Sequence, residues 1–457
     1  MAVILVCALS LGMCGYVVAD ASDAVPGWIT LEPASYASAY PSVSEHQSEP
    51  ANTAHSGILP DPAAAPVPDA AIVQNALNQL VRDVGAEARV GAVVTDAVTG
   101  ETLAEINPAT SLVPASNMKI LTAYAALTEL GPESTFSTKA MLSGVDLYLV
   151  GGGDILLAAD TGDTNAINGR AGLGDLARAS AEKLKASGIS SVNVYVDTSA
   201  YSGPAYAPGV STGNYKWVMQ NAPIAVDRAQ VEGSQLGEPA SRALDDFVAR
   251  LSEAGITATN SGNALAPKEA KELARVQSAP VRAVADMMLL ESDNSLAENL
   301  AHQVALARGK EGSFAGGSEA MQEILAAADM PLDGAIIADG SGLSFDNRLT
   351  PQLLVSLLAK VWNCDTAKGC ATTQIGTGMP LSGYDGTLKT RFQEEQMIAR
   401  VHAKTGSLQN ASSLSGFAYT IAGRPLIFSI IVNDLSPDLS GHYRPAIDKA
   451  VTTIAHS

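Results

Sequence analysis

The chain has 457 residues, of which 47% are hydrophobic and 16% are charged. This balance is typical of a globular protein of about two to three domains and excludes a wholly disordered chain. Asp and Glu number 47 against 28 Lys and Arg, and because the resulting net charge of −19 repels a phosphate backbone, we expect no nucleic acid partner.

The start of the chain indicates export. Residues 2–19 form one apolar stretch, and Ala19-Asp20-Ala21 has the small-x-small pattern of a signal-peptidase site. No basic segment precedes the stretch, which is nearly long enough to span a membrane. Residues 1–21 are therefore predicted to be a signal peptide or a membrane anchor, and membrane association through the N-terminus stays open. Leu-Gly-Met before Cys14 is a poor lipoprotein signal, so we predict no lipidation.

Residues 22–69 are rich in Ala, Ser and Pro without helical or strand periodicity, which predicts an extended linker. The first folded element is an amphipathic helix from residue 70 to the glycine at 85. The runs 89–96 and 101–107 then flank Ala-Val-Thr-Gly and predict a hairpin, and a helix is expected over 116–130.

Residues 141–274 alternate strand-like and helical runs and contain many glycines, which predicts an inserted α/β domain. Its expected strands are 146–150 and 192–196, and its expected helices are 173–186 and 240–254. Beyond it we predict helices over 279–308, 317–328, 350–361 and 444–455, and antiparallel strands over 398–405, 414–421 and 426–432. The fold class is α/β (α+β).

Two cysteines outside the apolar start, Cys364 and Cys370, are separated by five residues. In an exported protein such a pair usually closes a small loop as a disulfide. Two free thiols are the alternative, and a metal site is less favoured because no His or third Cys accompanies them.

No His-Asp-Ser arrangement and no metal-ligand spacing stands out, which leaves a Ser-Lys mechanism. Ser116 and Lys119 lie one turn apart at the start of a predicted helix, within reach for proton transfer. To act as a base the amine must be neutral, which requires desolvation or a nearby cation. Ser180 and Lys183 have the same spacing, but on a charged amphipathic helix where Lys is most simply solvated.

Two further motifs offer polar groups. Ser292-Asp293-Asn294 is predicted at a loop or helix start, although Ser-x-Asn also occurs at 191–193 and 261–263 and commonly marks a turn or cap. Lys404-Thr405-Gly406 occurs once, on a predicted strand ending in Ser407. A Lys and a Thr on a strand can line a groove, and Gly lets a ligand backbone approach closely.

The order Ser116, Ser292, Lys404 matches the three signatures of penicillin-recognising serine enzymes. Over residues 70–457 the chain resembles the D-alanyl-D-alanine carboxypeptidase/endopeptidase family of type-4 penicillin-binding proteins. The sequences that carry the resemblance are Leu-Val-Pro-Ala-Ser-Asn-Met-Lys, Ser-Asp-Asn-Ser-Leu-Ala-Glu-Asn-Leu, Asp-Gly-Ser-Gly-Leu-Ser and His-Ala-Lys-Thr-Gly-Ser. The resemblance implies a β-lactamase/transpeptidase-like domain, an antiparallel sheet flanked by helices, formed by 70–140 and 275–457. That family inserts extra domains between the first two motifs, which explains 141–274.

The resemblance also implies roles for individual residues, without a metal or a cofactor. Ser116 would be acylated with Lys119 as base, and Ser292 would relay a proton to the leaving D-alanine. The backbone N–H groups of Ser116 and Ser407 would form the oxyanion hole. The substrate-binding residues would be Asn294 for the substrate amide, Lys404 and Thr405 for its terminal carboxylate, and Gly406 and Ser407 on the same strand.

We therefore expect an extracytoplasmic serine D-Ala-D-Ala carboxypeptidase that trims peptidoglycan stem peptides and is acylated by β-lactams. Endopeptidase activity stays open beside it. A non-catalytic wall-binding or sensor protein is the alternative from another class. A β-lactamase is less favoured because no motif places a Glu to activate the deacylating water.

Three positions depart from family members that bind the free end of a diaminopimelyl side chain. Those members have an acid in the insert, an Arg after Gly-Leu-Ser and a Ser beyond Lys-Thr-Gly. The corresponding residues here are Asn214 or Tyr215, Phe345 and Gln409. A site without those charges is not expected to favour a zwitterionic side chain.

Overall fold

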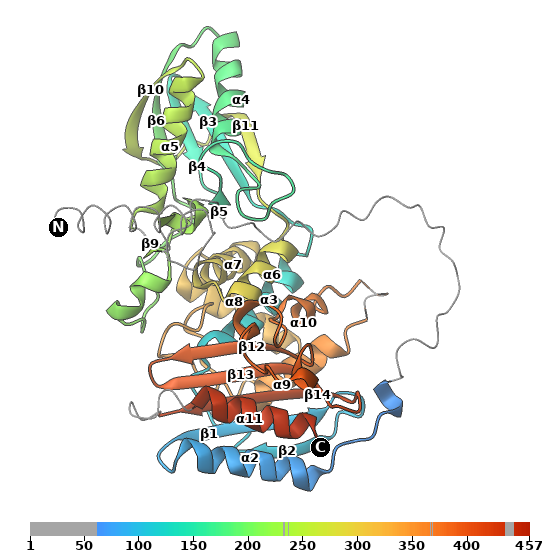
Figure 1. The fold of residues 1–457 in the computed structure, drawn as a ribbon. Helices are drawn as coiled ribbons and strands as arrows, with labels where there is room; N and C mark the ends of the chain where they lie inside the picture. Colours follow the sequence, from blue (N-terminus) through green and yellow to red (C-terminus); the bar gives the residue numbers. More distant parts are fainter. Residues whose placement is uncertain (1–61, 232–233, 236, 366, 368, 435–442) are drawn as a thin grey trace, which may run out of the picture. The chain divides into compact units, whose positions relative to one another are not determined.

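The computed structural model describes residues 62–457 apart from 232–233, 236, 366, 368 and 435–442 (Figure 1). The predicted signal peptide or anchor and most of the predicted linker lie outside the described residues. The last part of that linker contains a short 3-10 helix, η1 (Pro62–Ala64). None of the helices in the described part is long and apolar enough to cross a membrane.

A five-stranded antiparallel sheet unites the two ends of the described chain in the order β12-β13-β14-β1-β2. Strand β14 pairs with β1 from Arg89↔Asn433 to Asp96↔Leu426, although the two are more than 300 residues apart. Every residue of β14 is buried, as its continuous apolar run requires of a strand covered on both faces. The strands are β1 (Arg89–Asp96), β2 (Thr102–Ile106), β12 (Val401–Leu408), β13 (Ala411–Tyr419) and β14 (Pro425–Asn433).

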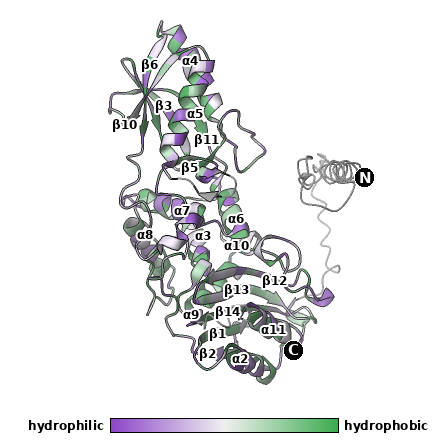
Figure 2. Ribbon diagram, turned by 60° about the vertical axis from the view of Figure 1, so that its left-hand side comes forward, coloured by the Kyte–Doolittle hydropathy of each residue, from purple (hydrophilic) through white to green (hydrophobic). Residues whose placement is uncertain are grey.

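Two helices cover one face of this sheet (Figure 1), namely α2 (Ala70–Val84) and α11 (Tyr443–Ala455). The Asp69 side chain caps the start of α2 by accepting from the Ala71 N–H group, and Gly85 ends the helix at a φ of 91°. Figure 2 shows the strands mainly in the hydrophobic colour, which agrees with burial on both faces. On this side the sheet therefore packs against the apolar faces of α2 and α11.

The other face carries the helices around the motif residues. In α3 (Met118–Glu129) every residue from Met118 to Leu127 is buried, including the polar residues Lys119 and Thr122. The remaining helices of this part are α6 (Val281–Glu291), α7 (Asn294–Ala307), α8 (Phe314–Ala327), α9 (Pro351–Trp362) and the short α10 (Gln374–Gly378).

The middle of the chain builds a second five-stranded sheet, in the order β10-β6-β4-β3-β11, which packs against α4 and α5. Strand β6 is parallel to β4 and β10, whereas β3 is antiparallel to β4 and β11. The predicted domain limits at 141 and 274 fall within β3 and β11. The elements are β3 (Ser137–Ser143), β4 (Asp146–Val150), β5 (Asp154–Leu157), α4 (Leu173–Ala186), β6 (Ser191–Asp197), β7 (Ile224–Val226), β8 (Gln230–Val231), β9 (Ser234–Gln235), α5 (Pro239–Glu253), β10 (Thr257–Asn263) and β11 (Lys271–Gln277).

The predicted mixed fold class is confirmed, and the predicted helical stretch 279–308 consists of two helices, with Ser292-Asp293-Asn294 at the start of the second. The run 279–308 is interrupted between α6 and α7, because Ser292 adopts a left-handed φ of 59° and ends α6. The Asp293 side chain then accepts from the Leu296 N–H group and starts α7. A side chain that bonds its own backbone in this way competes with helix continuation. The interruption places Ser292 and Asn294 in a turn between two helix ends.

After α9 the chain makes a small loop in which Cys364 and Cys370 are joined as a disulfide, with their Cα atoms 5.7 Å apart. This is the pairing predicted from their spacing.

Candidate active site

The first motif lies at the start of α3. Ser116 belongs to the 3-10 turn η2 (Ala115–Asn117), which leads directly into the helix. Lys119 follows one turn later, and its Nζ atom donates to the Ser116 Oγ atom at 3.1 Å. Ser116 is half-buried, whereas Lys119 is fully buried. The structure therefore brings together the Ser-Lys pair that the sequence predicts.

Lys119 is surrounded by acceptors. Its Nζ atom also donates to the Asn294 Oδ1 atom at 2.7 Å and to the Ser341 carbonyl at 2.6 Å. Burial lowers the pKa of Lys119 to about 8, although the charges of Asp339, Glu298 and Asp293 oppose this shift. Of the two causes considered from the sequence, desolvation is thus the one that lowers its pKa.

The second and third motifs meet at Lys404 on β12. Its Nζ atom donates to the Ser292 Oγ atom at 2.8 Å and to the Thr405 carbonyl at 2.9 Å. Lys404 is fully buried, and burial, followed by the charge of Lys119, lowers its pKa well below the usual range. A carboxylate is the group that would best stabilise an ammonium ion here.

Asn294, the first residue of α7, connects Lys119 to the middle part of the chain. Its Oδ1 atom accepts from Lys119, and its Nδ2 group donates to the Trp217 carbonyl at 2.9 Å. Trp217 ends the 3-10 segment η3 (Thr212–Trp217). These two bonds fix which way the Asn294 amide points. Trp217 could not be identified from its residue type, since its contribution is a backbone carbonyl.

The rest of the third motif runs along β12 beside the segment that carries Ser116. The Thr405 hydroxyl donates to the Thr387 hydroxyl at 2.8 Å, and the Arg444 guanidinium donates to the Ser407 hydroxyl at 3.0 Å. A Cβ atom on Gly406 would lie 2.8 Å from the Pro114 carbonyl oxygen. Gly406 is therefore required for the close approach of β12 to the Ser116 turn.

Two buried carboxyl groups support the site from behind Lys119. Glu298 accepts from the Gly340 and Ser341 N–H groups at 2.9 and 3.0 Å, and burial raises its pKa. Asp339 accepts from the Gly342 and Ser344 N–H groups at 2.7 and 2.6 Å. Together they hold the turn whose Ser341 carbonyl accepts from Lys119. Neither acid was predicted as a site residue from the sequence.

The competing motif copies do not form comparable sites. The Ser180 hydroxyl donates to the Leu176 carbonyl of its own helix at 2.7 Å, and Lys183 donates to the Leu273 carbonyl. The other Ser-x-Asn copies lie on β6 and β10 of the second sheet. Among the described residues, no group of three or more His, Cys, Asp or Glu side chains is arranged to hold a metal ion.

The segment around η3 borders the turn that contains Phe345. The Ser344 hydroxyl donates to the Pro208 carbonyl at 2.6 Å, and the Phe345 N–H group donates to the Gly209 carbonyl at 3.1 Å. Tyr215 stacks on Tyr206 with ring centroids 3.9 Å apart. Gln409 lies exposed in the turn between β12 and β13.

Penicillin-recognising serine enzymes have this kind of site. Its parts are a serine hydrogen-bonded to a buried lysine, a Ser-x-Asn turn and a Lys-Thr-Gly strand. Residues 73–238 and 225–454 match the D-Ala-D-Ala carboxypeptidase 3 (S13) family, to which the chain belongs. The chain is accordingly a D-Ala-D-Ala carboxypeptidase, a hydrolase, and the resemblance seen in its motifs is confirmed.

Several characterised proteins are similar over most of their length. Carboxypeptidase Rv3627c of Mycobacterium tuberculosis is 34% identical over 403 residues, covering 84% of this chain and 85% of the relative. Carboxypeptidase DacB of Mycolicibacterium smegmatis is 32% identical over 409 residues, covering 85% of each. The crystal structure of penicillin-binding protein 4 (dacB) from Haemophilus influenzae matches with a TM-score of 0.67 at 21% identity, covering 83% of this chain and 98% of that one, and shows the same fold.

Proposed function

We propose that the chain cleaves D-Ala-D-Ala ends through an acyl-enzyme on Ser116. The observation that carries the proposal is the 3.1 Å contact between the Ser116 Oγ and Lys119 Nζ atoms, since a buried amine with a lowered pKa can take the hydroxyl proton. The Oγ atom then attacks the carbonyl of the penultimate residue, and the bond to the terminal D-alanine breaks. Water hydrolyses the ester in a second step and regenerates the serine.

The second serine serves the leaving group. Ser292 lies 2.8 Å from Lys404, so its hydroxyl can pass a proton to the departing amine while Lys404 stabilises the chain end. The terminal carboxylate binds at Lys404 and Thr405, whose charge and hydroxyl lie on one strand. The amide of Asn294 holds the peptide backbone of the substrate.

Developing negative charge on the attacked oxygen is stabilised by the backbone N–H groups of Ser116 and Ser407. This assignment is supported by the packing of β12 against η2, which places the two segments side by side at Gly406. Losing one such donor typically costs about 3 kcal/mol of transition-state stabilisation.

The natural substrates in this proposal are peptidoglycan stem peptides, so the enzyme works outside the cytoplasm, whether its N-terminal segment is cleaved or kept as an anchor. β-Lactams act as covalent inhibitors, as the family resemblance implies and as the complex of the Haemophilus influenzae protein with a novel β-lactam suggests. Cleavage of cross-links stays open, and a predatory endopeptidase from Bdellovibrio bacteriovorus shares the fold with a TM-score of 0.50 at 16% identity.

The test is labelling by a fluorescent penicillin together with release of D-alanine from a pentapeptide. We expect one labelled site, and both activities lost in Ser116→Ala but kept in Ser180→Ala, the matched serine of the second Ser-x-x-Lys copy. Labelling without D-alanine release would favour the non-catalytic sensor, and rapid recovery from labelling would favour a β-lactamase. Label on Ser180, or none, would refute the assignment of Ser116.

A further inference from the structure

The turn η4 (Asp227–Ala229) of the inserted domain has an unusual backbone. Three consecutive non-glycine residues, Asp227, Arg228 and Ala229, have positive φ angles of 44°, 55° and 53°. Such conformations are unfavourable for residues with a Cβ atom and persist only where the surroundings hold them in place. Arg228 and Ala229 are both buried.

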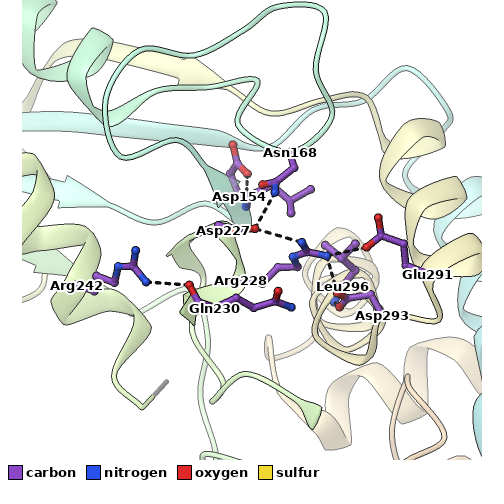
Figure 3. A network of polar contacts seen from close by, with 10 residues as sticks. Asp154, Asn168, Asp227, Arg228, Gln230, Arg242, Glu291, Asp293 and Leu296 are labelled. Carbon is purple, nitrogen blue, oxygen red and sulfur yellow. Dashed lines mark hydrogen bonds and ion pairs between the residues drawn. The ribbon is translucent and has the colours of Figure 1, made fainter. Parts of the chain in front are cut away.

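The strained turn directs Arg228 toward the Ser-Asp-Asn motif (Figure 3). Its Nη1 atom donates to the Glu291 Oε2 and Asp293 Oδ2 atoms, both at 2.9 Å, and its Nη2 atom lies 3.2 Å from the Asp227 Oδ1 atom. The side chains of Arg228 and Asp293 are only 9% and 7% exposed. Ion pairs that are shielded from water to this extent fix geometry more firmly than exposed ones.

Asp293 is held on both of its oxygens. The Oδ1 atom accepts from the Leu296 N–H group at 2.8 Å, and the Oδ2 atom accepts from Arg228. On one side of Asp293 is Ser292 with its left-handed backbone, and on the other is Asn294. A shift of the Asp293 carboxylate would therefore move both neighbouring residues relative to Lys404 and Lys119.

We propose that Arg228 is a positioning residue of the inserted domain, whose ion pairs with Glu291 and Asp293 hold Ser292 and Asn294 in their reactive geometry. The inference rests on the proposed function, because it takes Ser292 and Asn294 to act on the substrate.

The same contacts have an electrostatic consequence at Lys119. The charged groups facing its amine are Asp339 and Glu298 from behind, Asp293 from the start of α7, and Lys404 from β12. The three carboxyl groups raise the pKa of Lys119 against the effect of burial. Since Arg228 offsets the charge of Asp293, removing it leaves Lys119 more readily protonated. The amine would then become neutral, and able to act as a base, only at higher pH.

The experiment compares three variants by the rate constant for acylation of Ser116 with a fluorescent penicillin from about pH 6 to pH 10, and by their thermal unfolding midpoints. Arg228→Met removes the guanidinium. Arg228→Lys keeps the charge but has a single nitrogen, which cannot replace both the Nη1 contacts with Glu291 and Asp293 and the Nη2 contact with Asp227. The matched control is Arg242→Met. Among the described residues, its side chain contacts the Gln230 carbonyl (Figure 3) and Asp246, and neither belongs to the Ser-Asp-Asn turn.

We expect Arg228→Met to acylate about 10- to 100-fold more slowly, the loss typical of small misplacements at an active site, and its rising pH limb to move to higher pH. Arg228→Lys should lose less of the acylation rate, and its rate should rise with pH over the same range as that of the wild type. Arg242→Met should stay within about two-fold of the wild type.

A folded Arg228→Met variant with the rate and pH limb of the wild type would overturn the inference, as would an equal loss in Arg242→Met. If Arg228→Met does not fold, Arg228→Lys decides, and a full wild-type rate in that variant refutes the role. If the wild type itself is not acylated at Ser116, the proposed function fails first and this inference fails with it.

Discussion

Gly406→Ala is expected to separate β12 from the turn that carries Ser116. A Cβ atom at this position would lie 2.1 Å from the Ser413 Oγ atom, 2.8 Å from the Pro114 carbonyl oxygen and 3.1 Å from the Ala115 Cβ atom. The Ser413 hydroxyl can rotate away, but it then gives up its 2.7 Å hydrogen bond to the same Pro114 carbonyl. The Pro114 oxygen belongs to the backbone, so the close contact with it can be relieved only by moving the strand or the turn.

The size of the effect follows from these contacts. Ordinary contact begins near 3.4 Å, so the gap between Gly406 and Pro114 must widen by about 0.6 Å. Overpacking of this kind costs about 1–3 kcal/mol of unfolding free energy. Leaving a buried polar group without its partner costs about another 1–3 kcal/mol. A displacement of this size between Ser116 and β12 should slow acylation about 10- to 100-fold.

The assay measures the acylation rate with a fluorescent penicillin and the free energy of unfolding in denaturant. Ser413→Ala serves as control, because it removes the hydrogen bond without adding an atom at position 406. Gly406→Ala/Ser413→Ala should recover part of the stability but little of the acylation rate, since the contact with Pro114 remains. If Gly406→Ala alone acylates at the wild-type rate, the close packing of β12 on the Ser116 turn does not govern reactivity.

Three further predictions concern the base, the disulfide and the substrate. The acylation rate of the wild type should rise with pH through the Lys119 pKa of about 8, because the neutral amine is the base. Lys119→Arg should lack this rise and acylate about 100- to 10,000-fold more slowly. An unchanged rate would show that Lys119 is not the base. Reduction of the Cys364–Cys370 disulfide should lower the free energy of unfolding by about 2 kcal/mol, and peptide mapping that finds two free thiols in the exported protein would contradict the pairing. Between two pentapeptides that differ only in amidation of the stem-peptide side chain, the neutral form should have the higher kcat/KM, because desolvating a zwitterion is costly and neither Phe345 nor Gln409 offers it a charge. The opposite order would mean that another part of the insert supplies charges.

The elements and motifs that depend on local pattern were predictable from the sequence. Strands β13 and β14 follow from apolar runs around a short turn, and the pairing of Ser116 with Lys119 follows from one helical turn of spacing. Local pattern alone could not predict that the three motifs lie close together in space, and this expectation came from the family resemblance.

Features that depend on tertiary contact were not predictable. A loop or helix start at Ser292-Asp293-Asn294 was predicted, but the left-handed backbone of Ser292 and the ion pair of Asp293 with Arg228 were not. Glu298 and Asp339 look like ordinary surface acids until two distant segments meet around Lys119. Arg228 lies in a backbone conformation that no residue pattern signals.

The segment that forms the second sheet begins and ends at neighbouring residues. The Ser278 N–H group donates to the Phe136 carbonyl at 2.9 Å, and the Phe136 N–H group donates to the Ser278 hydroxyl at 2.9 Å. Strands β3 and β11 continue side by side from there. Insertions with adjacent ends can be gained or shortened without displacing the elements that they interrupt. A chain closed by a short turn across this point would keep its first sheet, yet Asn294 would lose the Trp217 carbonyl and Asp293 would lose Arg228. The outer part of this segment therefore makes no contact that the first sheet needs, whereas Trp217 and Arg228 are tied to the Ser-Asp-Asn turn by hydrogen bonds.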